Sequence, residues 1–145
     1  MQIENLHHYV FVRQDISVRQ QAVQSNHATF LLARTLPHTI GTPNLVLIGV
    51  PDAAALRAVM QTLDTNNIEY VAYEEPANDM GLSSVATVPL GANDRLCLSG
   101  FKTWKPIELG VQVQSLPLAP ILSTSVAYEG STESFSSVSS HGSKT

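Results

Sequence analysis

One predicted helix carries glutamine and histidine side chains at a spacing that could support chemistry. Gln20, Gln24 and His27 are separated by four and then three residues, so in a helix their side chains share one side. An imidazole exchanges protons near neutral pH, and a carboxamide can orient water or a carbonyl oxygen. This pattern indicates a hydrolytic or ligand-binding face; the competing interpretation is a solvated helix surface that holds a histidine.

Charged residues follow two of the predicted strands. Arg13 and Asp15 come at the end of the first strand, and Glu74 and Glu75 end the third. Ligands of open α/β sheets collect at the carboxyl ends of strands. We therefore expect the helix stripe and one of the glutamates to line a common crevice. The alternatives are that Arg13 and Asp15 pair or cap the helix, and that the glutamates are solvated.

Hydrophobic patterning predicts the elements that position these residues. Apolar runs predict strands, and amphipathic spacing behind capping residues such as Ser17 and Asp52 predicts helices. The predicted strands cover residues 7–13, 44–50, 69–75 and 83–90, and the predicted helices cover residues 18–34, 53–67 and 92–104. The alternation of strands and helices predicts a three-layer α/β/α fold with a mixed, mostly parallel four-stranded sheet.

Composition changes near residue 106. Residues 1–106 form the predicted α/β domain, whereas the rest of the chain is rich in Ser, Thr, Pro and Gly. Alternation within residues 107–122 predicts a strand or an arm. Residues 123–145 hold few large apolar side chains, so we expect a flexible Ser/Thr-rich tail.

Bulk composition narrows the classes of function. The chain has 145 residues, 43% of them apolar, and a net charge of −4 with only 8 Lys and Arg, which gives no general attraction for polyanions. The single Cys97 excludes an internal disulfide and is expected to be buried. His7 and His8 precede or begin a strand, where we expect surface or edge packing and no metal site. The apolar runs are too short for a membrane span, so we expect a cytoplasmic protein with no membrane partner.

The order and spacing of these motifs resemble the peptidyl-tRNA hydrolase family of the archaeal and eukaryotic type (type II). The resemblance covers residues 7–106. Members have a strand that ends in Val-Arg-x-Asp-hydrophobic and a helix that carries Ala-x-Gln-x-x-His-Ala. The matching residues here are Val12, Arg13, Asp15 and Ile16, followed by Ala22, Gln24, His27 and Ala28.

The resemblance implies hydrolysis of the ester between a peptide and the terminal ribose of tRNA, without a metal or another cofactor. It implies that His27 orients water or substrate beside Glu75, and that Gln20 and Gln24 donate to a carbonyl oxygen. Further residues are implied in substrate binding, some of them through phosphate. These are Arg13, Asp15, Arg19, Ser83, Lys102 and Lys105. Trp104 beside the two lysines is either part of such a patch or a packing anchor.

Two departures from the family keep other functions open. Gln20 stands where the family has a lysine, and Glu75 lies in a shorter loop than the family's aspartate does. A first alternative is a protein that binds or cleaves a small nucleotide or signalling ligand in the same crevice. A second alternative is an assembly module, in which residues 107–122 pair with the sheet edge of a neighbour, for example in a homodimer.

Overall fold

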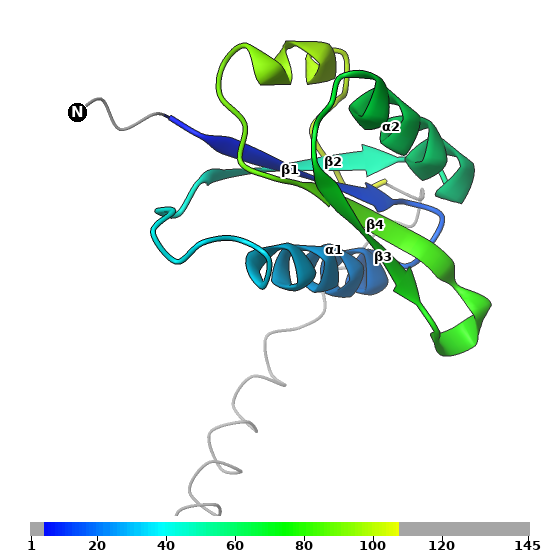
Figure 1. The fold of residues 1–145 in the computed structure, drawn as a ribbon. Coiled ribbons are helices and arrows are strands. Elements are labelled where there is room, and N and C mark those ends of the chain that lie inside the picture. The colour runs from blue at the N-terminus through cyan, green and yellow to red at the C-terminus, as the bar shows by residue number, and fades with distance from the viewer. Residues whose placement is uncertain (1–4, 108–145) are drawn as a thin grey trace, which may run out of the picture. The chain divides into compact units, whose positions relative to one another are not determined.

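Two helices cover opposite faces of a single β-sheet (Figure 1). The computed structural model describes residues 5–107 of the chain. The elements run in the order β1 (His7–Arg13), α1 (Val18–Ala33), β2 (Asn44–Val50), α2 (Ala53–Thr65), β3 (Tyr70–Glu75) and β4 (Gly81–Thr87), with short 3-10 turns at Ala77–Asp79 and Asp94–Leu98. The predicted arm and tail lie outside the described residues. Within residues 5–107, no helix combines the length and apolar character needed to cross a bilayer.

The prediction of a mostly parallel sheet is wrong. The strand order is β2-β1-β4-β3, and among neighbouring strands of residues 5–107 only the pair β1 and β2 is parallel. Strand β4 lies between β1 and β3 and is antiparallel to both. The reason is the short connection of residues 76–80 between β3 and β4, because a parallel crossover needs a dozen or more residues and so short a link makes a hairpin.

Alternation along β1 divides the core between the two faces. Phe11 belongs to the cluster beneath α2, with Leu56, Val59 and Leu63, whereas Val10 belongs to the cluster beneath α1. Successive strand residues point to opposite faces, so the apolar residues 10–12 in the middle of β1 contribute side chains to both clusters. The buried side of helix α1 is less apolar than that of α2, because Gln21 and Gln24 are buried in α1 where α2 has aliphatic side chains.

The predicted caps of both helices are confirmed. Ser17 Oγ accepts a hydrogen bond from the Gln20 backbone N–H, at 3.2 Å, and α1 begins at Val18. Asp52 Oδ1 accepts from the Ala55 N–H at 2.9 Å. These bonds satisfy backbone donors that have no partner within the helix. The first cap fixes the start of α1 beside the end of β1.

The helix predicted over residues 92–104 is wrong. Only the 3-10 turn Asp94–Leu98 forms, and the chain then extends along β2. Thr103 pairs with Ile48 in an antiparallel bridge, and the Trp104 N–H donates to the Leu47 carbonyl at 2.7 Å. These bonds use backbone groups on the outer edge of β2, which a longer helix here would leave without partners.

Candidate functional site

A buried carboxamide lies at the centre of the polar cluster between α1, β3 and β4. Gln24 is 1% exposed. Its Nε2 donates to Glu75 Oε2 at 3.1 Å and to Gln20 Oε1 at 3.3 Å. Its Oε1 accepts from Ser83 Oγ at 2.7 Å. Both ends of the amide are therefore occupied, so Gln24 orients its neighbours and has no free group for a substrate.

A β-bulge in β4 directs two consecutive serines toward Gln24. Tyr73 pairs with Ser84 but Glu74 pairs with Leu82, so Ser83 is the additional residue. Ser84 Oγ donates to the Gln24 carbonyl oxygen at 2.6 Å, while Ser83 Oγ bonds the side-chain oxygen. Consecutive residues of a regular strand face opposite sides of the sheet. The bulge removes that alternation, as bulges beside functional sites commonly do.

Glu75 is held as an ionised carboxylate. Its Oε1 accepts from the Ala77 backbone N–H at 3.0 Å, and its Oε2 accepts from Gln24. The bond from Ala77, then the bond from Gln24 and the nearby His27 ring, lower the pKa of the Glu75 carboxyl below its usual value. The carboxylate thus has a fixed direction and stays negative at neutral pH.

His27 lies between this carboxylate and the solvent. Its Nδ1 is 3.7 Å from Glu75 Oε2, and its side chain is 43% exposed while that of Glu75 is 14% exposed. Nδ1 itself is sealed from solvent and has no hydrogen-bond partner in the described part of the chain. The ring also lies against Tyr73, with 4.7 Å between ring centroids. Within residues 5–107 the Nε2 atom makes no hydrogen bond, so the ring directs Nδ1 toward the carboxylate and leaves Nε2 without a protein partner.

This arrangement can support general acid–base chemistry. A carboxylate that faces one imidazole nitrogen favours a proton there, which leaves the other nitrogen as a base. The 3.7 Å separation exceeds hydrogen-bond length, but such contacts are often long without substrate and shorten in the reacting complex. Gln20 adds a donor: its Oε1 is held by Gln24, and its Nε2 has no partner among residues 5–107.

The structure thus brings four predicted residues together, namely Gln20, Gln24, His27 and Glu75. Glu74 is exposed and stays outside the cluster. Ser83 joins the cluster through Gln24. Tyr73 and Ser84 were missed by the sequence analysis; the spacing of Tyr73 and Glu75 along a strand was the available signal for the tyrosine, and no pattern revealed the bulge.

Arg13 and Asp15 form a separate, structural pair. Arg13 Nε and Nη2 each donate to an Asp15 carboxylate oxygen at 2.6 Å. Arg13 Nη1 also donates to the Met80 and Leu82 carbonyls, at 2.9 and 3.3 Å. Through these bonds the Arg13 guanidinium connects the end of β1 to the start of β4. This geometry favours the pairing interpretation of Arg13 and Asp15 over direct phosphate binding.

The other predicted substrate-binding residues make no side-chain hydrogen bond or ion pair with the His27 cluster in the described part of the chain. Arg19, Lys102 and Lys105 are exposed. Lys105 contacts the rest of the domain through its backbone carbonyl, which accepts from Gln14 Nε2 at 2.9 Å. Trp104 is half-buried, and its Nε1 donates to Gln21 Oε1 at 2.7 Å. This contact supports the packing interpretation of Trp104.

The Arg13–Asp15 pair predicts a specific dependence of stability on pH. The hydrogen bonds from Arg13 lower the pKa of Asp15, so the pair stabilises the fold above the unfolded pKa of about 3.9 and loses this effect as pH falls through the folded value. Asp15 is 39% exposed, so solvent screening limits the effect to ~1 kcal/mol or less. We expect Asp15→Asn to lower the free energy of unfolding at pH 7 by that amount in urea titrations. The difference from wild type should shrink as the pH falls below the unfolded pKa of about 3.9; a constant difference across pH would contradict this.

Comparison with known proteins informs the fold but not the activity. Neither family models nor curated protein sequences give a match to this chain. A solved structure of a protein of unknown function from Agrobacterium, Atu0240, is similar with a TM-score of 0.52 and 16% sequence identity. The similarity covers 70% of this chain and 98% of the Agrobacterium chain. At this identity the likeness concerns the arrangement of helices and strands alone.

Proposed function

We propose that this protein is a peptidyl-tRNA hydrolase-like enzyme of the cytoplasm, which cleaves the ester between a peptide and the terminal ribose of tRNA. The observation that supports the proposal is the convergence of His27 and Glu75 from distant parts of the chain, with 3.7 Å between Nδ1 and Oε2. The resemblance of residues 7–106 to the type II family supplies the substrate class.

The proposed reaction uses water as the nucleophile. His27 Nε2 takes a proton from water while the water oxygen attacks the ester carbonyl carbon, and Glu75 stabilises the imidazolium that forms. Gln20 Nε2 donates to the oxyanion. The bond between the carbonyl carbon and the ribose oxygen then breaks, and the imidazolium returns its proton to that oxygen. The products are a free peptide and a tRNA with an intact terminal hydroxyl.

A substitution at Gln20 tests the proposal by an expected increase in activity. A lysine at this position would place a cation beside the oxyanion or a substrate phosphate. We expect Gln20→Lys to raise peptidyl-tRNA turnover about tenfold in a low-salt assay, and Gln20→Met, which lacks both amide and charge, to lower it. The proposal fails if wild type and Gln20→Lys both release no peptide.

A second candidate function is favoured by the acidic net charge of −4 and by the absence of the family lysine. In this alternative the same crevice binds a small nucleotide. A ligand that prefers the folded state raises the unfolding midpoint. Inactivity on peptidyl-tRNA together with a nucleotide-dependent rise in midpoint, abolished by Glu75→Gln, would replace the hydrolase proposal with this one.

A further inference from the structure

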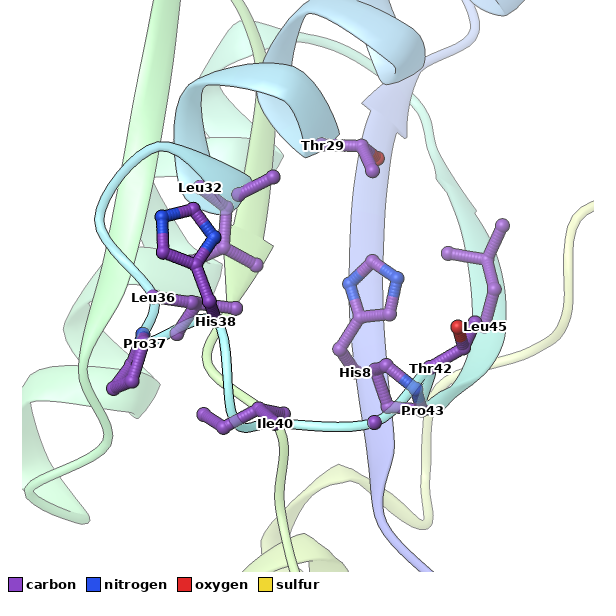
Figure 2. Close-up of a pocket in the computed structure, with 12 residues that line it drawn as sticks. His8, Thr29, Leu32, Leu36, Pro37, His38, Ile40, Thr42, Pro43 and Leu45 are labelled. Carbon is purple, nitrogen blue, oxygen red and sulfur yellow. The ribbon is translucent and has the colours of Figure 1, made fainter.

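A cavity lies on the opposite flank of α1 from the His27 cluster. It has a volume of about 480 Å³ and lies between the end of α1, the loop of residues 37–43 and the first residues of β2 (Figure 2). It shares no lining residue with the His27 cluster. The lining side chains include Leu32, Leu36, Ile40 and Leu45, and among residues 5–107 none of the lining residues is Lys, Arg, Asp or Glu.

Two histidines line this mainly apolar cavity: His38 is exposed, whereas His8 is buried. It belongs to β1, is 7% exposed and presents its ring to the cavity (Figure 2). The prediction of a surface or edge position for His8 is therefore wrong, because the side chain is buried within the domain. Its Nδ1 is sealed and has no hydrogen-bond partner, and within residues 5–107 its Nε2 also makes no hydrogen bond. Burial lowers the pKa of His8, which favours the neutral ring.

A buried polar group without a partner is costly and uncommon in folded proteins. The two threonines that line the cavity do not satisfy His8, and Thr29 Oγ1 already donates to the Ser25 carbonyl at 3.0 Å. A ligand with one polar group would hydrogen-bond to Nε2, the ring nitrogen of His8 that is not sealed, while its apolar body would fill the remaining space. The cavity volume is within the range of small-molecule sites.

We propose that this cavity binds a small, uncharged, mainly apolar molecule that carries one hydroxyl group, and that the hydroxyl hydrogen-bonds to His8. A hydroxyl both donates and accepts, so it can pair with either tautomer of a neutral imidazole. An ionised ligand is disfavoured because the lining offers no permanently charged partner. The inference does not depend on the proposed hydrolase activity.

A matched pair of probes tests the role of His8. 4-Ethylphenol and ethylbenzene have similar shapes, but only the phenol can hydrogen-bond. We expect 4-ethylphenol to bind wild type with a Kd on the order of 1 mM, and roughly threefold to tenfold more tightly than ethylbenzene. Binding is measured by two-dimensional amide NMR, with shifts expected at Thr29, Ile40 and Leu45.

Two variants complete the test. His8→Phe keeps an aromatic ring but removes the hydrogen bond, so ethylbenzene should then bind more tightly than 4-ethylphenol. Ala33→Phe, at an exposed position of the lining, should block both probes without unfolding the domain. The proposal is overturned if wild type binds ethylbenzene as tightly as 4-ethylphenol. It is equally overturned if the amide signals of the cavity residues shift neither with 10 mM 4-ethylphenol nor with saturating ethylbenzene. A third contradicting result is an Ala33→Phe variant that binds 4-ethylphenol as tightly as wild type does.

Discussion

Replacing His27 with alanine is expected to lower kcat/KM for peptidyl-tRNA about 100-fold, the usual scale for a positioned acid–base group. That factor corresponds to ~2.7 kcal/mol of transition-state stabilisation. The free energy of unfolding should change much less, by ~1 kcal/mol or less, because the ring is 43% exposed and alanine is a good helix former. Turnover and urea unfolding of the same preparation separate the two effects.

Asn26→Ala provides the matched control for this variant. Asn26 precedes His27 on α1 and is exposed, and among residues 5–107 its side chain bonds only the Ala22 carbonyl of its own helix, at 2.7 Å. We expect turnover within twofold of wild type. A His27→Ala enzyme that retains a third or more of wild-type turnover would remove the imidazole from the mechanism.

Replacing Gln24 with glutamate is expected to have the largest effect on stability, about 3 kcal/mol at pH 8. The substitution preserves shape but sets a second carboxylate where Gln24 Nε2 now lies 3.1 Å from Glu75 Oε2. Two carboxylates at this distance cannot both ionise without a large cost, so the pKa of the pair rises in the folded protein. The penalty is therefore present above the unfolded pKa of about 4.3 and decreases as the pH falls toward that value.

Gln24→Leu separates this repulsion from simple loss of the amide. Like the glutamate, leucine loses the Nε2 bonds to Glu75 and Gln20, but it adds no charge. It also loses the bond from Ser83, whose Oγ retains the Tyr73 carbonyl as an acceptor at 3.3 Å. We expect a cost of about 2 kcal/mol relative to wild type that is similar at pH 8 and pH 5.5. Urea unfolding at both pH values measures the difference. Equal costs for the glutamate and leucine variants at pH 8 would show that Gln24 does not contact an ionised Glu75.

Much of the secondary structure could be predicted, because apolar runs and capping residues within a single segment indicate where a strand or helix forms. The apolar runs at residues 7–13 and 44–50 form strands with the predicted bounds, and Ser17 and Asp52 cap the predicted helices. The sheet order could not be predicted by the same reasoning. It depends on the hairpin between β3 and β4, where Asn78 and Asp79 adopt positive φ values of 57° and 51°, a conformation that few non-glycine residues adopt.

Long-range contacts explain the remaining differences. Residues 99–104 have apolar spacing that fits a helix, but Phe101 packs edge-on against Phe11, with 5.1 Å between ring centroids, and Trp104 bonds Leu47. Pairing with β2 therefore overrides local helix propensity. The approach of His27 to Glu75 was expected from the family resemblance. The contact of Ser84 with Gln24 was not expected, because a one-residue bulge leaves no signal in hydrophobic alternation.

A double-mutant cycle on peptidyl-tRNA hydrolysis tests most directly whether His27 and Glu75 act as one catalytic unit. It compares wild type, His27→Ala, Glu75→Gln and the double variant in single-turnover release of peptide. Because Glu75 acts through the imidazole, we predict that the double variant is within about threefold of His27→Ala alone. Losses that multiply in the double variant, or a wild-type protein that releases no peptide, would contradict the account.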